Sequence, residues 1–368
     1  MINNENITRP TTLEVNISNA KYNIEQIKKI VGAEIKIMPV IKANAYGTYL
    51  NENLEYLNMF DIVAVAIVDE GVRIRNLGYK KDIFVLNQPY TTEIEKIIDN
   101  NLIIGVSSNS FVEALGNNGK NVKIHVEIGS GMGRTGIHPR RVDEFLNKIA
   151  QYPNICVDGI YTHLSSADID PEYTKKQLES FDMAVEKAKQ KLDTIRFVHA
   201  QASTGILNFN EKKYNLVRPG LILYGFYPDD TFKDKIDLKP VITKLSSKVT
   251  FLKEVPANFS IGYGRSYITT RETKVATIPI GYADGFRRCL SNNWTVMINE
   301  KRVPIIGNVC MDSFMADVTE IEVKNGDEVI IFDNENITLE EYAQASQGIT
   351  YELICTIGAR VPRKYIEE

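Results

Sequence analysis

The stretch Val122–Gly136, VKIHVEIGSGMGRTG, joins a short β-branched run to a glycine-rich loop with polar residues. The run Val122–Ile128 predicts a β-strand, because valine and isoleucine favour the extended backbone. The glycines that follow predict a turn with an exposed backbone. A strand that ends at polar residues and glycines is typical of the carboxyl-terminal face of a β/α barrel, where such enzymes place their active sites.

Seven further short apolar runs lie on either side of this stretch. They are Ile35–Ile41, Ile62–Ala66, Ile83–Leu86, Ile103–Val106, Val157–Tyr161, Arg196–Ala200 and Leu216–Leu223. Segments with helical spacing of apolar residues lie between most of the runs, as from Ile17 to Val31. Eight strands that alternate with helices favour an α/β fold with a (β/α)8 TIM-type barrel over a doubly wound sheet.

The character of the sequence changes after Tyr227. Residues 228–240, PDDTFKDKIDLKP, are polar and charged and predict a linker. Beyond the linker, short strand-like runs alternate with Gly, Asn and Asp turns: Val275–Ile280, Trp294–Ile298, Arg302–Ile306 and Glu328–Ile331. We therefore predict two domains, a barrel over residues 1–238 and a mainly β domain over residues 239–368.

Composition excludes several classes of protein. The chain has 368 residues, of which 43% are hydrophobic and 24% charged, as in a globular protein. Its net charge of −4 gives no basic surface for nucleic acid. No run approaches the roughly 18 apolar residues of a membrane span, and the polar N-terminus lacks a secretory signal. Four scattered cysteines without a CxxC pair indicate reduced thiols, so we expect a cytoplasmic protein without a metal site.

Polar or ionisable residues follow five of the eight predicted strands. These are Lys42 after the first, Arg134 after the fifth, His163 after the sixth, Ser203 after the seventh, and Arg218, Gly220 and Tyr224 at the eighth. A lysine at a strand end is more often a solvated surface charge, but Lys42 ends an apolar strand and precedes small residues. Ser203 and Gly220 offer hydroxyl and backbone donors to a phosphate. Their convergence predicts a ligand site.

Several residues have a structural interpretation that competes with a functional one. The loop Gly129–Gly136 is either a flexible turn or a phosphate cradle, and its spacing fits neither a Walker loop nor a dinucleotide fingerprint. His125 and His199 are expected to be hydrogen-bonded core histidines. Tyr263 and Tyr282 stand beside glycines, and either one alone would be interpreted as a turn tyrosine packed on the core.

Eight motifs, taken in order, resemble the alanine racemase family, whose members depend on pyridoxal 5'-phosphate (PLP). The motifs are VIKANAYG from Val40, GSGMGRTG from Gly129, YTHLSS from Tyr161, VRPGLILYG from Val217, GYGRSY from Gly262, IPIGYADGF from Ile278, GNVCMD from Gly307 and YELICTIGARVPR from Tyr351. They extend over nearly the whole chain. The resemblance implies a homodimeric isomerase that interconverts L- and D-alanine and supplies D-alanine for peptidoglycan.

The resemblance also implies roles for individual residues. Lys42 would carry PLP as a Schiff base and act as one catalytic base, and Tyr263 would be the second base. Positions that match cofactor-binding residues of the family are Tyr46, Ser203, Gly220 and Leu221 at the phosphate, Arg218 at the pyridine nitrogen with His163 beside that arginine, and Arg134 at the phenolic oxygen. Arg134, Met311 and Asp312 match the substrate carboxylate site. Tyr263 and the Met311 loop would come from the partner subunit.

Racemisation explains why two bases are needed. A proton must leave one face of the α-carbon and another must arrive at the opposite face, while PLP delocalises the electron pair. An arginine at the pyridine nitrogen keeps that nitrogen unprotonated, because the guanidinium itself stays charged. This weakens the electron sink and should disfavour side reactions such as transamination.

The chain departs from the family pattern at three places. Glu127 replaces a lysine that is often carboxylated, so we predict no such modification here. Thr48 and Tyr49 replace a histidine and a glycine. Ala359 replaces a tyrosine that narrows the substrate pocket in some members, which makes a serine or broad-specificity racemase the main alternative.

Two further alternatives involve other classes of protein. A non-catalytic PLP-binding barrel protein would resemble only the first domain. A related amino-acid decarboxylase would carry its own cysteine and aspartate motif where this chain has CMD followed by SFM, from Cys310.

Overall fold

The computed structural model describes residues 7–210 and 212–367 and divides into two compact units. The first, here called the barrel unit, consists of Lys21–Ala45 and Leu50–Lys239. The second, here called the β unit, consists of the chain up to Ala20, the segment Tyr46–Tyr49, and the chain from Pro240 onward.

Eight parallel strands form the barrel unit. Six of them form one sheet in chain order: β3 (Ile62–Val65), β4 (Asp82–Val85), β5 (Ile103–Val106), β6 (Val122–Glu127), β7 (Ile155–Tyr161) and β8 (Phe197–His199). The other two, β2 (Lys36–Ile37) and β9 (Leu216–Val217), pair with each other. Single parallel bridges from Val40 to Ala64 and from Ala202 to Arg218 connect this pair to both edges of the sheet. The predicted (β/α)8 arrangement is confirmed.

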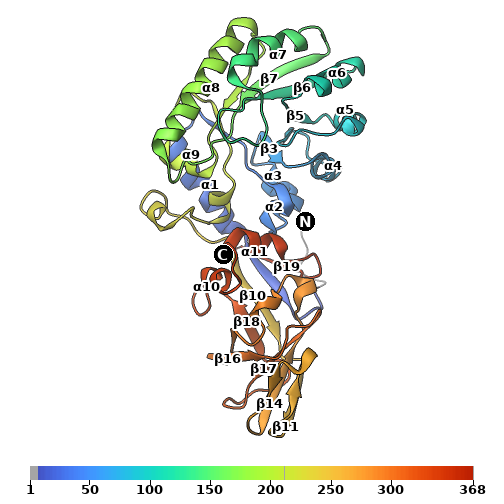
Figure 1. Ribbon diagram of the computed structural model, residues 1–368, viewed down its shortest axis with the longest axis vertical. Coiled ribbons are helices and arrows are strands. Elements are labelled where there is room, and N and C mark those ends of the chain that lie inside the picture. The colour runs from blue at the N-terminus through green and yellow to red at the C-terminus, as the bar shows by residue number, and fades with distance from the viewer. Residues whose placement is uncertain (1–6, 211, 368) are drawn as a thin grey trace. The chain divides into compact units, whose positions relative to one another are not determined.

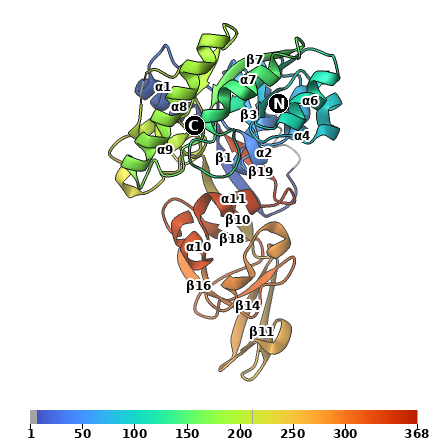
Figure 2. The same ribbon diagram turned by 45° about the horizontal axis from the view of Figure 1, so that its top comes forward.

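Helices lie on the outside of these strands (Figures 1 and 2). They are α1 (Ile17–Val31), α3 (Leu54–Leu57), α4 (Val68–Asn76), α5 (Ile94–Asp99), α6 (Asn109–Asn117), α7 (Val142–Ile149), α8 (Pro171–Lys191) and α9 (Ser203–Asn208). All residues of β3 and β5 are buried, as expected of parallel strands that are covered on both faces. Helix α8 begins at Pro171, where Asp170 caps it by accepting a hydrogen bond from the Tyr173 N–H at 2.9 Å.

The predicted strand Leu216–Leu223 is too long. Strand β9 ends at Val217, and the 3-10 helix η5 (Leu221–Tyr224) follows. Pro219 has no N–H to donate to a neighbouring strand, and the Gly220 N–H turns instead toward the Ser203 hydroxyl, at 3.2 Å.

A nine-stranded sheet forms the β unit. Its order is β11 (Phe251–Val255), β14 (Thr273–Ile278), β17 (Phe314–Asp317), β16 (Lys301–Ile306), β15 (Thr295–Ile298), β18 (Glu328–Phe332), β10 (Ile242–Lys248), β1 (Thr12–Asn16) and β19 (Arg363–Ile366). The β unit also contains the hairpin of β12 (Ser260–Ile261) with β13 (Tyr267–Ile268), and the helices α10 (Leu339–Ala345) and α11 (Thr350–Thr356). The four strands predicted after the linker are present as β14, β15, β16 and β18.

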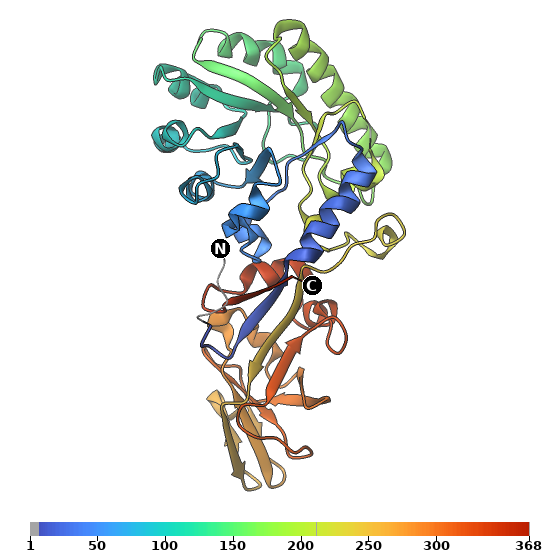
Figure 3. The ribbon, with the colours of Figure 1, turned by 180° about the vertical axis from the view of Figure 1, so that it is seen from behind.

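The N-terminal strand differs from the predicted domain division. We placed residues 1–238 in the barrel, but β1 pairs antiparallel with β10 and parallel with β19 (Figure 3). Leu13 and Val15 are fully buried there. The chain up to Ala20 therefore groups with the β unit, while the later boundary, after Lys239, lies one residue from the predicted one. Within the described ranges, no helix has the length and apolar character needed to cross a membrane.

Candidate active site

Lys42 begins a turn with an unusual backbone. It follows Ile41, beyond the single bridge at Val40. Strand β2 ends at Ile37, so the predicted strand Ile35–Ile41 is too long. The next three residues, Ala43, Asn44 and Ala45, have φ values of 51°, 54° and 52°. Tyr46 continues the turn with φ 54°. Left-handed helical geometry costs about 1–2 kcal/mol for each residue other than glycine. A run of four such residues persists only where its surroundings hold it, and strain of this kind clusters at functional sites.

Glu70 of α4 holds this turn from the side. Its Oε1 accepts a hydrogen bond from the Ala43 N–H at 2.7 Å, and its Oε2 accepts one from the Ala66 N–H at 2.8 Å. Arg73, one helical turn later, donates to Asn44 Oδ1 at 3.1 Å. The carboxylate therefore connects the turn after Lys42 to the end of β3. Sequence reasoning missed Glu70, because an acidic residue in the first turn of a helix is common for other reasons.

Arg218 lies deep in the barrel, with 1% of its surface exposed. Its NH2 donates to the Thr162 and Ala200 carbonyl oxygens at 2.7 and 3.1 Å and lies 3.4 Å from His163 Nδ1. Its NH1 lies 2.6 Å from His199 Nδ1. Burial lowers the pKa of Arg218 to about 10, which leaves the guanidinium charged at neutral pH.

The surroundings of His163 show that the residues predicted at the strand ends lie close together. Burial lowers its pKa most, and the charges of Arg218, Arg134 and Lys42 lower it further, to about 3. These cations act on His163 because they lie around it, although they follow three different strands. The imidazole is therefore neutral at physiological pH.

The donors that we predicted for a phosphate lie close together at Ser203. The Gly220 and Ile222 N–H groups point at its hydroxyl oxygen, at 3.2 and 3.4 Å. Leu221 begins η5 between these two residues, and Ser203 begins α9. Converging N–H groups and a hydroxyl match the chemistry of a phosphate dianion, so this part of the barrel fits the PLP phosphate.

Glu127 and Arg134 line a small pocket together with His163. Glu127 is 4% exposed, and its Oε1 accepts a hydrogen bond from the Thr135 hydroxyl at 2.7 Å. Burial raises the pKa of Glu127, whereas the Thr135 hydrogen bond and the Arg134 charge oppose that rise. Glu127 thus places a carboxylate beside Arg134 without any modification.

The predicted residues of the β unit lie near one another. Tyr263 begins the 3-10 helix η7 (Tyr263–Arg265) and is 72% exposed, and its carbonyl accepts a hydrogen bond from Asn308 Nδ2 at 2.8 Å. Tyr263 and Cys310 line one open cavity of about 430 Å³. Met311, the next residue, is 52% exposed. Loop Asn308–Asp312 and Tyr263 thus form one surface.

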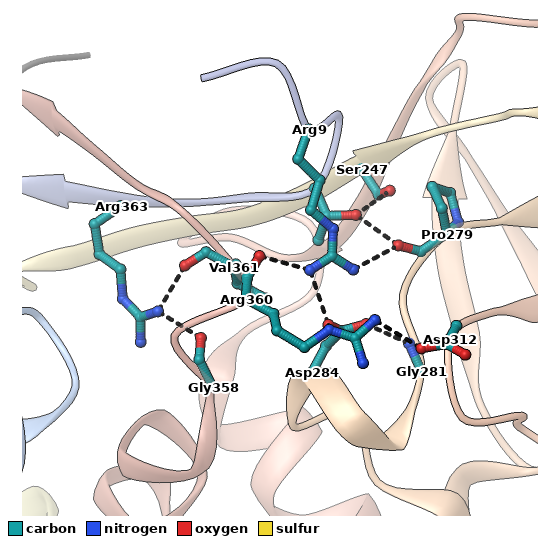
Figure 4. A network of polar contacts seen from close by, with 11 residues as sticks. Arg9, Ser247, Pro279, Gly281, Asp284, Asp312, Gly358, Arg360, Val361 and Arg363 are labelled. Atoms are coloured by element: carbon teal, nitrogen blue, oxygen red, sulfur yellow. Dashed lines mark hydrogen bonds and ion pairs between the residues drawn. The ribbon is translucent and has the colours of Figure 1, made fainter. Parts of the chain in front are cut away.

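A network of charged residues fixes the end of that loop (Figure 4). Arg360 NH2 donates to Asp312 Oδ1 at 2.6 Å, and Arg360 Nε lies 3.4 Å from the buried carboxylate of Asp284. Arg9 also donates to Asp284, at 2.8 Å, and the second Asp284 oxygen accepts from the Gly281 N–H at 3.0 Å. Sequence reasoning missed Arg360, although the motif that contains it was part of the resemblance.

The segment Tyr46–Tyr49 packs on the C-terminal part of the β unit. The Thr48 carbonyl accepts a hydrogen bond from the Tyr365 hydroxyl at 3.0 Å, and the Arg363 guanidinium lies 4.5 Å from the Tyr49 ring centre. The two departures Thr48 and Tyr49 thus contact C-terminal residues. Burial raises the pKa of Tyr46. Because Tyr46 belongs to this unit, its approach to the phosphate donors remains a prediction. Ala359 is exposed.

Among residues 7–210 and 212–367, no group of three or more His, Cys, Asp or Glu side chains could hold a metal ion.

Comparisons with known proteins agree with this arrangement. Residues 15–228 match the model of the alanine racemase N-terminal domain, and residues 242–365 match that of the alanine racemase C-terminal domain. An alanine racemase of Halothermothrix orenii is 38% identical over 98% of this chain and 98% of its own length. One from Methanococcus maripaludis is 38% identical over 98% of this chain and 100% of its own.

Solved structures show the same relationship. The alanine racemase of Clostridium difficile 630 matches with a TM-score of 0.91 and 35% identity, over 98% of this chain and 97% of that one. The alanine racemase of Bacillus anthracis with bound L-Ala-P also matches with a TM-score of 0.91, at 32% identity over 98% and 96% of the two chains. The chain therefore belongs to the alanine racemase family.

Proposed function

We propose that the chain is a PLP-dependent alanine racemase that interconverts L- and D-alanine and supplies D-alanine for peptidoglycan in the cytoplasm. The observation that carries the proposal is the cluster around His163. Lys42, Arg134 and Arg218 follow different strands of the barrel, yet all three lie close enough to lower the pKa of His163. A cationic site beside the Ser203 hydroxyl and the Gly220 N–H fits an anionic cofactor and a carboxylate substrate.

Residues of the barrel unit would hold PLP. Lys42 would bind it through the amine, and Ser203, Gly220 and Leu221, with Tyr46, would bind the phosphate. Arg218 would face the ring nitrogen beside His163, and Arg134 the phenolic oxygen. When bound, PLP takes up the electron pair that remains after the α-proton leaves. Because the Arg218 guanidinium stays charged, it would donate a hydrogen bond to the ring nitrogen and keep its own proton.

Lys42 and Tyr263 would act as the two bases on opposite faces of the α-carbon. Met311 and Asp312 would line the substrate carboxylate site together with Arg134. Tyr263 and Met311 are exposed in the single chain, which supports a homodimer in which each active site combines the barrel unit of one subunit with the β unit of its partner.

Serine is the second candidate substrate, because Ala359 leaves room where some relatives carry a tyrosine. Measuring kcat/KM for L-alanine and L-serine decides between them. We expect alanine to be preferred, and a preference for serine of more than about tenfold contradicts the alanine assignment. In Ala359→Tyr, turnover of serine should fall more than turnover of alanine. Release of carbon dioxide from basic amino acids would instead identify a decarboxylase.

A further inference from the structure

Two histidines form a buried contact inside the barrel. His125 of β6 and His199 of β8 are both fully buried, and His125 Nδ1 lies 2.8 Å from His199 Nε2. The expectation that both are hydrogen-bonded core histidines is confirmed. Neither residue belongs to the predicted active site, but His199 Nδ1 contacts Arg218 NH1 at 2.6 Å.

The Arg218 end of this chain of contacts fixes its direction. At one end Arg218 can only donate hydrogen bonds. At the other end His125 Nε2 lies 3.5 Å from Asp158 Oδ2 without forming a hydrogen bond, so the carboxylate acts on this nitrogen through its charge. His199 therefore accepts at Nδ1 and donates from Nε2. His125 in turn accepts at Nδ1 and holds its proton on Nε2, toward Asp158.

Both histidines must be neutral for this chain to exist. Burial lowers the pKa of His199, as do the charges of Arg218 and His125. Burial also lowers the pKa of His125, although Asp158 opposes the shift. A second proton on either ring would place two donors face to face at one contact.

Packing prevents the rings from turning over. The His125 ring stacks on Phe84 with 4.5 Å between ring centres, and the His199 ring stacks on Tyr161 at 5.0 Å. Gly159 of β7 makes room for His125, since a Cβ on Gly159 would lie 2.7 Å from the imidazole. A ring flip, which would put a carbon atom in place of each nitrogen at these contacts, cannot occur without moving these neighbours.

The far end of the chain is held by a salt bridge. Arg196 NH2 donates to Asp158 Oδ2 at 2.8 Å and to Asp82 Oδ2 at 2.5 Å. Burial alone would raise the pKa of Asp158, but its contacts with His125 and Arg196 outweigh burial and lower it. Asp158 is thus a carboxylate that is 5% exposed, and it faces His125 in its charged, accepting form.

We propose that Asp158 and His125 are positioning residues that act through His199 on Arg218. The one-way hydrogen-bond chain keeps His199 Nδ1 as an acceptor, and this acceptor, with the Thr162 and Ala200 carbonyls, fixes the rotation of the guanidinium. The remaining N–H groups of Arg218 are then held toward the ring nitrogen of the cofactor. Only this last step rests on the proposed function, since the tautomers follow from contacts within the chain.

Nuclear magnetic resonance of the full-length, PLP-supplemented protein with 15N-labelled histidine tests the proposal. The chain has four histidines, so single His→Gln variants assign the signals. We expect His125 and His199 to be neutral with the proton on Nε2 from about pH 6 to 8.5, around the ordinary histidine pKa. A proton on Nδ1 of either ring, or titration of either ring in this range, overturns the proposal whether or not the protein racemises alanine.

The substitution Asp158→Asn tests whether Asp158 acts on Arg218 through the two histidines. Removing the carboxylate charge weakens its attraction for the His125 Nε2–H, so the Nε2–H signals of His125 and His199 and the Arg218 N–H signal should all move. The matched control is Asp82→Asn, which also loses a partner of Arg196 but touches neither histidine. We expect kcat for alanine to fall about tenfold with little change in KM, by analogy with outer-shell partners of metal ligands. Unchanged His199 and Arg218 signals in Asp158→Asn contradict the proposal.

Discussion

The Glu70 carboxylate accepts a hydrogen bond from the backbone N–H of Ala43 at 2.7 Å, and Ala43 directly follows Lys42. The second Glu70 oxygen accepts from Ala66. In Glu70→Gln the side chain has one accepting oxygen, and its amide would turn a donor toward the other N–H. We expect a loss of about 1–3 kcal/mol in the free energy of unfolding, together with weaker PLP binding. Urea unfolding and PLP titration measure both effects.

Asp69→Asn is the matched control for Glu70→Gln. Asp69 lies in the same helix and forms an exposed salt bridge with Lys96 at 2.7 Å, a type of pair that contributes at most about 1 kcal/mol. PLP affinity should be unchanged in this variant. Equal PLP affinity in Glu70→Gln and Asp69→Asn would show that Glu70 does not hold the turn.

His163 should make the free energy of unfolding depend on pH in the acid range. Burial and the charges around it lower its pKa to about 3, whereas an unfolded histidine titrates near 6.5. As the pH falls below about 6.5, His163 becomes protonated in the unfolded chain but stays neutral in the folded chain. The free energy of unfolding therefore decreases by up to about 1.4 kcal/mol per pH unit. In His163→Gln this contribution is absent, and the stability should fall less between about pH 7 and 5.

Urea unfolding at several pH values measures this slope. His138→Gln serves as the control, because His138 is exposed in a loop. An identical slope in His163→Gln and in the unchanged protein contradicts the assignment of a neutral, half-buried His163.

Tyr263 should be essential for one direction of proton transfer. Since its side chain is 72% exposed in the single chain, Tyr263→Phe should fold normally. Loss of a general base lowers the rate about 10²–10⁴-fold. In deuterated water, exchange of the α-proton should persist from one alanine enantiomer, through Lys42, and disappear from the other. Equal exchange from both enantiomers would exclude Tyr263 as the second base.

Arg360 should affect substrate binding more than stability. Its side chain pairs with Asp312 at 2.6 Å and is half-exposed, so the pair adds little to folding. Arg360→Gln frees Asp312 and the end of the loop that includes Met311, and we expect KM for alanine to rise several-fold. The control is Arg271→Gln, which breaks the exposed contact of Arg271 with Glu320 in the same unit. Equal KM values in the two variants would show that Arg360 does not affect substrate binding.

The barrel could be predicted because each of its strands is formed by residues that are adjacent in the sequence. Each parallel strand is buried on both faces and therefore reads as a short apolar run, as in β3 and β5. Polar residues at the strand ends were conspicuous against these runs. Strand β1 carried no such signal, since its partners β10 and β19 lie more than 200 residues further along the chain.

Features that depend on tertiary contacts could not be predicted. Ala43 and Ala45 have no intrinsic preference for the left-handed conformation, although Asn44 tolerates it, and Glu70 from another element holds the turn. The contact between His125 and His199 joins residues 74 positions apart, and its direction depends on Arg218 at one end. Likewise, Arg360 became part of the site only when Asp312 was placed beside it.

The most direct test of the proposed mechanism is to identify the lysine that binds PLP. Borohydride reduction of the PLP-supplemented protein, followed by digestion and mass spectrometry, locates the modified lysine. We predict that the label is found on the peptide that contains Lys42, and that Lys42→Ala shows neither the visible absorbance of bound PLP nor racemisation of alanine. A label on a different lysine, or racemisation by Lys42→Ala, would contradict the mechanism.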